Sequence, residues 1–277
     1  MAAPRTLSLL NFLIVALNFL WIAILENAIL FDFTFTDTIA FYPSYLTPAL
    51  FTYKIWSFIA ITMILAAYFM FRGTQEPHYT SNTIKKVEKI DYLLILNQMA
   101  LGLSMTLKHN DYFFWSILYS GVCLITVIII NNRIHIQKLT SNSLTRYFIR
   151  LGFGVYTGWI MFVFGFNSAV ILSKLSLQLG EQQFFFLNVA VLLLVTLAMV
   201  IYSYYNFLPS VSAVLVWGCY GVYYQANLSD ISDRHDIKPY LIFAMAIGTI
   251  FTVYNYYRCT VRRNEINIRM EEPPSIP

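Results

Sequence analysis

The chain has 277 residues, of which 58% are hydrophobic, 17% aromatic and only 12% charged, and its formal net charge is +4. Soluble domains carry about 25% charged residues, so this composition excludes an ordinary soluble protein and predicts an integral membrane protein. The length leaves room for one polytopic bundle with short loops, and we treat residues 1–277 as a single transmembrane domain.

Eight hydrophobic stretches are long enough, or nearly so, to cross a bilayer as helices. They lie near residues 8–31, 47–71, 92–107, 112–130, 150–172, 184–205, 210–226 and 239–257. The third is short and the sixth and seventh nearly merge, so the count is about eight. The apolar runs do not alternate with period two, which favours helices over a β-barrel. The sequence therefore predicts an all-α polytopic transmembrane helix bundle.

The loops differ in charge from one side of this predicted bundle to the other. Basic residues gather in the even-numbered loops and in the tail of residues 258–277, which places both termini in the cytoplasm by the positive-inside rule. Lys108 falls in an exterior loop in this assignment. Because the topology explains the net charge, we expect no nucleic-acid partner, whereas basic loops could contact anionic membrane lipids. Which membrane holds the chain is not encoded.

The chain lacks the residue patterns of common catalytic and metal sites. The histidines fall in loops or at helix ends, so a haem ligated by histidine between helices is not expected. The three scattered cysteines predict neither disulfides nor a metal site. No zinc, phosphate-binding or nucleophile motif is present. We assign no catalytic residue, no metal and no required cofactor, and an enzyme would need a second acid or base near the pocket, which the spans lack.

Polar side chains in the first hydrophobic stretch need partners inside a bilayer. Glu26, near its exterior end, is the ionisable residue best placed within a span, where an acid is a functional candidate. A solvated glutamate at a helix end explains Glu26 equally well. Asn11 and Asn18 are seven residues apart and nearly in line on a helix, which favours hydrogen bonds between helices over ligand contact.

The fifth hydrophobic stretch has the most informative pattern. At about 100° per residue, four of its side chains share a narrow sector of the helix: Tyr156, Trp159, Val163 and Asn167. An asparagine amide turned toward lipid would lack hydrogen-bond partners, so we expect this face to line a pocket. Gly154 and Gly158 have the small-xxx-small spacing, which allows close packing within the bundle or at the face of a homodimer.

Three segments, taken in order, resemble the TspO/MBR family, the tryptophan-rich sensory or translocator proteins. The segment from Pro48 to Trp56 resembles the family's proline-rich entry into an aromatic helix. Asn97, preceded by leucine, is similar to the Leu-Asn of the third helix. Tyr156-x-x-Trp159 with the later Asn167 is similar to the motif of the fifth helix. The resemblance implies a five-helix core over residues 8–173 and the three-helix extension of longer members over residues 184–257.

The resemblance also implies a pocket between helices that binds a planar lipophile, either a porphyrin or other tetrapyrrole or a sterol, in a sensory or ligand-handling role. Trp56, Tyr156 and Trp159 would stack on a planar ring. Asn97 and Asn167 would orient its polar edge, and a bound haem would have no histidine ligand.

Two alternatives to this ligand-binding interpretation stay open. One is a small-molecule transporter with Glu26 as its proton-coupling site. The other is a structural membrane protein that has lost the family ligand, in which the same aromatic side chains fill the core and the asparagines bond between helices. The resemblance further implies that the loop of residues 32–47 closes the pocket. The identity of the ligand and the oligomeric state are not encoded in a recognisable way.

Overall fold

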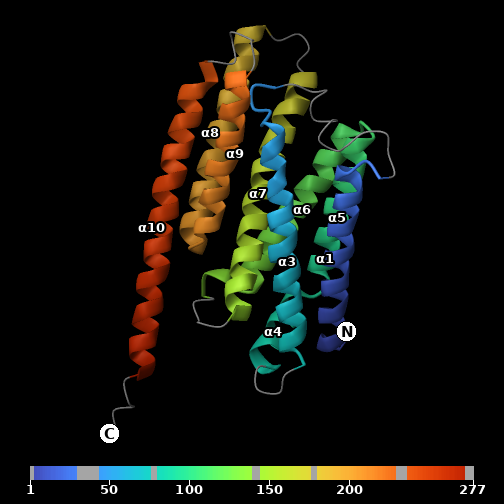
Figure 1. Ribbon diagram of the computed structural model, residues 1–277, viewed down its shortest axis with the longest axis vertical. Coiled ribbons are helices and arrows are strands. Elements are labelled where there is room, and N and C mark those ends of the chain that lie inside the picture. Colours follow the sequence, from blue (N-terminus) through green and yellow to red (C-terminus); the bar gives the residue numbers. More distant parts are fainter. Residues whose placement is uncertain are drawn as a thin grey trace.

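The computed structural model of the chain describes residues 3–29, 44–75, 80–138, 144–175, 180–228 and 236–271. In these ranges the chain is a bundle of helices without strands, which confirms the predicted all-α polytopic class (Figure 1). The elements are α1 Pro4–Glu26, η1 Leu50–Lys54, α3 Ile55–Gly73, α4 Thr80–Ile90, α5 Leu93–His109, α6 Phe113–Arg133, η2 Ile136–Lys138, α7 Leu144–Leu175, α8 Glu181–Asn206, α9 Pro209–Leu228 and α10 Lys238–Glu271.

The helices have the lengths that a bilayer requires. Within the described ranges, six spans are long and apolar enough to cross a membrane: α1, η1 with α3, α6, α7, α8 and α10. The bent pair of α4 and α5, which meet at 51°, makes a seventh candidate. α9 has 20 residues and does not count among these spans, but it packs along α7 and α10. Each of the eight predicted stretches overlaps one of these long helices.

Two elements differ from the sequence-based expectation. α10 continues to Glu271, so the first part of the predicted tail is helical. α4 was not predicted, because its closely spaced charges resemble a loop. Val87 and Ile90 are buried while Lys85 and Lys89 are exposed, which makes α4 a short amphipathic helix that packs against α1, α3 and α6.

The bundle has two groups of helices joined by α7. α1, α5 and α6 pack together on one side, and α8, α9 and α10 pack together on the other. α7 contacts α3 and α6 as well as α8 and α9, so it lies between the groups (Figure 1). α1 begins and α10 ends toward the same end of the bundle, where α4 also lies (Figure 1).

Glycines let α7 approach both of its neighbours. A Cβ atom on Gly152 would lie 2.8 Å from the carbonyl oxygen of Thr62 on α3. A Cβ atom on Gly158 would lie 3.1 Å from the Cα atom of Val211 on α9, and Gly154 faces α9 as well. The small-xxx-small spacing therefore serves packing inside the bundle, and α9 covers the face that a second copy would otherwise use.

Candidate functional site

Asn97 and Tyr156, two of the predicted ligand contacts, lie in a buried hydrogen-bond network. The Nδ2 atom of Asn97 on α5 donates to the carbonyl oxygen of Cys123 at 2.7 Å and to the hydroxyl of Thr126 at 2.9 Å, both on α6. The hydroxyl of Tyr156 on α7 donates to Asn97 Oδ1 at 2.7 Å, and Gln98 Nε2 donates to the same oxygen at 3.0 Å. Protein groups thus occupy the polar atoms that were expected to orient a ligand.

The same network reaches α1. Asn18 Nδ2 donates to Gln98 Oε1 at 2.9 Å, so four helices are joined through buried side chains. Trp21 Nε1 adds a second link from α1 to α5 by donating to the hydroxyl of Thr106 at 2.9 Å. A connected polar network of this kind fixes how helices pack, because a shifted helix would leave buried polar groups without hydrogen-bond partners. The hydrogen bond of Asn18 to α5 agrees with the bonding between helices that its position favoured.

Trp159 on α7, another of the predicted ligand contacts, is fully buried among aromatic side chains. Its ring meets Tyr53 edge-on at a centroid distance of 5.9 Å and Trp56 edge-on at 6.1 Å. Phe162 stacks on it at 5.5 Å with an interplanar angle of 21°. Aromatic pairs stabilise by about 0.5–1.5 kcal/mol each beyond burial. Trp159 therefore packs against Trp56 and restrains its position.

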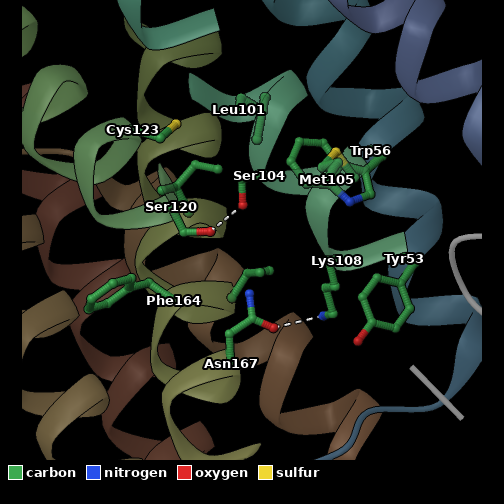
Figure 2. A pocket seen from close by; sticks show the side chains of 12 residues that line it. Tyr53, Trp56, Leu101, Ser104, Met105, Lys108, Ser120, Cys123, Phe164 and Asn167 are labelled. Atoms are coloured by element: carbon green, nitrogen blue, oxygen red, sulfur yellow. Dashed lines mark hydrogen bonds between the residues drawn. The ribbon is translucent and has the colours of Figure 1, made fainter. Parts of the chain in front are cut away.

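A small cavity lies where Asn167 of α7 faces α5 (Figure 2). Lys108 Nζ donates to Asn167 Oδ1 at 2.7 Å, and on the same wall Ser104 Oγ and Ser120 Oγ are 2.7 Å apart. The cavity volume is ≈ 20 Å³, which is about the space of one water molecule. A tetrapyrrole ring does not fit in this cavity as it stands.

Lys108 was expected in an exterior loop, and that prediction is wrong. α5 runs to His109, two residues past the expected end, and the Lys108 side chain is only 7% exposed within the bundle. The expectation that no second base lies near the pocket is corrected with it. A signal was present, because Asn97, Ser104 and Lys108 follow one another at helical spacings of seven and four residues and share one face.

A larger cavity of ≈ 530 Å³ lies between α1 and the segment from η1 to α3. Small-molecule sites typically measure about 300–1,000 Å³, so this cavity has a suitable size. Trp56 lines it, whereas Asn97, Tyr156, Trp159 and Asn167 do not. Its wall is mostly apolar and aromatic and includes two charged residues, Glu26 and Lys54.

Two aromatic side chains separate the large cavity from the small one. Tyr53 and Trp56 line both cavities and form the partition between them. Glu26 is the last residue of α1 and half-buried, as its predicted position near the helix end implied. Within the described part of the chain, no three histidine, cysteine, aspartate or glutamate side chains come together as metal ligands.

The partition is positioned by α9, which belongs to the predicted extension. Trp217 Nε1 of α9 donates to the carbonyl oxygen of Thr52 in η1 at 3.0 Å. The backbone N–H of Ala49 donates to the carbonyl oxygen of Gly221 at 3.0 Å. Of the predicted lid over residues 32–47, residues 32–43 lie outside the described residues, and Tyr45 packs against α8. The last three helices therefore help to shape the site.

The family assignment follows from comparison with known proteins. A family model described as TSPO-like protein matches residues 8–256, from α1 into α10, and so includes both the predicted core and the extension. Comparison with curated proteins and with solved structures gave no match. The match confirms the resemblance carried by the Trp56, Asn97 and Tyr156 segments. The chain is an integral multi-pass membrane protein and belongs to the family of TSPO-like proteins.

Proposed function

We propose that this TSPO-like protein binds a planar lipophilic ligand, a porphyrin or other tetrapyrrole or a sterol, in a sensory or ligand-handling role. The observation that carries the proposal is the ≈ 530 Å³ cavity with Trp56 on its wall. Family membership supports the same ligand class through the resemblance of the Trp56 segment. Sensing and handling both begin with this binding step.

The lining of the large cavity suits a flat apolar molecule. Phe19, Phe51, Tyr53 and Trp56 place aromatic rings around it, and such rings stack on planar ligands with little loss of side-chain freedom. No histidine lines either cavity, so a haem held here would rely on stacking and shape. In this proposal Trp159, Asn97 and Tyr156 do not contact the ligand. They stabilise the packing of the helices around the cavity.

Titration of the purified protein with protoporphyrin IX in lipid nanodiscs tests the proposal. Saturable quenching of tryptophan fluorescence is expected, after subtraction of the signal from empty nanodiscs. Ala60 lines the large cavity, and Ala60→Phe would place a ring in its volume and weaken binding at least tenfold. Ala198→Phe on the exposed face of α8 makes the same change outside the cavity and should bind like the unmodified protein.

Two results would contradict the proposal. One is a quenching signal that never saturates above that of empty nanodiscs. The other is an Ala60→Phe protein that is folded, as judged by its helical circular dichroism, and binds protoporphyrin IX as well as the Ala198→Phe control. Repeating the titration with a sterol as competitor ranks the two ligand classes, since both would occupy one cavity.

A further inference from the structure

We infer that Arg258 binds the phosphate group of an anionic membrane phospholipid at the corner between α8 and α9. Arg258 lines neither cavity, so this inference goes beyond the proposed function and does not depend on it. The site lies where α8 ends and α9 begins, beside α10, which continues past this corner (Figure 1).

The α8–α9 corner is tied to two other helices at Phe207. The carbonyl oxygen of Phe207 accepts hydrogen bonds from Arg150 Nη2 of α7 and from the Cys259 thiol of α10, the second at 3.1 Å. Ser203 Oγ of α8 donates to the carbonyl oxygen of Leu208 at 2.7 Å. Because hydrogen bonds from α7, α8 and α10 meet at this short connection, the side chains beside it are held in defined positions.

Aromatic rings hold the Arg258 guanidinium at this corner. Its Cζ atom lies 4.3 Å from the ring centroid of Phe207, 4.8 Å from that of Tyr204 and 5.3 Å from that of Tyr254. These cation–π contacts engage the flat face of the guanidinium and leave its N–H edge without an acceptor. Nη1 is buried with no hydrogen-bond partner, and no described residue accepts from Nε or Nη2 either.

The free edge of Arg258 suits a phosphate group. The side chain is half-buried and Nη1 is its covered nitrogen, so the Nε–Nη2 edge is the part that a ligand can reach from the surface. A guanidinium edge presents two parallel N–H donors, which match two oxygens of one phosphate and form charge-assisted hydrogen bonds. The rings then fix the orientation of the guanidinium, and the phosphate supplies the acceptors that the protein does not.

The position of Arg258 favours a phospholipid over a soluble phosphate. The apolar span of α10 ends at Val261, one turn past Arg258, so the guanidinium lies where hydrocarbon gives way to headgroups. Toward the middle of the span, Ile250 and Val253 are each 64% exposed and offer an apolar surface to acyl chains. A soluble phosphate would leave this surface unused, whereas a phospholipid contacts the guanidinium and the apolar surface together.

The charges of α10 favour an anionic headgroup over a zwitterionic one. Residues 239–264 include three positive side chains and no acid: the positive ones are Arg258, Arg262 and Arg263. The choline of a zwitterionic lipid would add a positive charge beside these arginines. A headgroup with a net negative charge is attracted by them, as anionic lipids are by basic residues at the end of a transmembrane helix.

Native mass spectrometry of the protein in uncharged detergent micelles, titrated with single lipids, measures the affinity for the first bound lipid. The unmodified protein should bind phosphatidylserine about tenfold more tightly than phosphatidylcholine. Arg258→Met should reduce this preference to about twofold or less. Lys89→Met removes a positive charge from an exposed position of α4, at the same end of the bundle, and should keep the preference of the unmodified protein.

A second pair of variants keeps the test valid if Arg258→Met does not fold. Tyr254→Leu removes one ring from the guanidinium without changing any charge, so the preference should fall about threefold or more. Tyr256→Leu, on a side chain that is 66% exposed and does not contact Arg258, should leave the preference unchanged.

Three results would overturn the inference. The first is equal binding of the two lipids by the unmodified protein. The second is a preference that survives in folded Arg258→Met or, where that variant does not fold, in Tyr254→Leu. The third is displacement of phosphatidylserine by millimolar inorganic phosphate, which would identify a site for soluble phosphate instead of a lipid.

Discussion

The buried network around Asn97 predicts how two substitutions combine. Tyr156→Phe removes a 2.7 Å hydrogen bond, but Asn97 Oδ1 still accepts from Gln98 at 3.0 Å, so no acceptor is left unsatisfied. The expected loss in the free energy of unfolding is about 1 kcal/mol. Asn97→Leu removes the acceptor of both the Tyr156 hydroxyl and the Gln98 amide. Two buried donors then lose a partner, and the expected loss is about 2–4 kcal/mol.

The double variant tests whether Asn97 and Tyr156 contribute to the free energy of unfolding together or independently. With Asn97 replaced, the Tyr156 hydroxyl keeps only Cys123 Sγ at 3.1 Å and a long hydrogen bond from Gln98 Nε2 at 3.4 Å, so adding Tyr156→Phe should cost less than it does in the unmodified protein. Denaturation by SDS in mixed micelles, followed by circular dichroism, measures the four free energies of the cycle. Tyr205→Phe, on an exposed side chain of α8, is the matched control and should change stability by less than about 0.5 kcal/mol.

Additivity would refute this reasoning. If the two single changes sum to the double change within about 0.5 kcal/mol, the side chains are not coupled as their hydrogen bonds require. The same variants also separate a packing role from a ligand role. Because Asn97 and Tyr156 do not line the large cavity, folded variants should bind protoporphyrin IX within about twofold of the unmodified protein, whereas direct ligand contacts would lose far more.

Two further predictions concern helix packing and topology. Gly152→Ala puts a methyl group 2.8 Å from the carbonyl oxygen of Thr62 and should destabilise the bundle by about 1–3 kcal/mol in the same SDS assay. Gly180→Ala is the control, because a methyl group there would have no atom within 4 Å and should not destabilise the bundle. Cys259 on α10 is half-buried and the other two cysteines are buried, so a membrane-impermeant maleimide should label one thiol. With a cytoplasmic C-terminus, labelling is expected only in permeabilised cells. Labelling of sealed cells would place this end of α10 outside.

The helical fold could be predicted from the sequence because crossing a bilayer is a local requirement. About 20 consecutive apolar residues satisfy it whatever their neighbours are, and the long helices overlap the predicted stretches for that reason. The Trp56, Asn97 and Tyr156 motifs, in order, led to the family that comparison then confirmed. α4 was not predicted because it is short, charged and amphipathic. A hydropathy window averages its buried Val87 and Ile90 with exposed lysines.

The candidate site was only partly predictable. Helical periodicity correctly grouped Tyr156 and Trp159 on one buried face of α7. It contained no information about what that face meets, and in the folded chain it meets Asn97, Tyr53 and Trp56 rather than open space. Of the five residues expected to contact a ligand, only Trp56 lines the large cavity. Glu26, which the sequence marked separately as an acid within a span, also lines it.

The sequence by itself determined the membrane environment, the helices and the family, because hydrophobic length and short motifs are properties of contiguous segments. Only the tertiary structure decided where space remains between the helices, since a cavity depends on side chains that arrive from different elements. It also decided that Lys108, next to a polar loop in the sequence, turns inward to meet Asn167, which is 59 residues away along the chain. The helical spacing of Lys108 with Asn97 and Ser104 indicates one shared face, but burial of that face depends on the helices that pack against it.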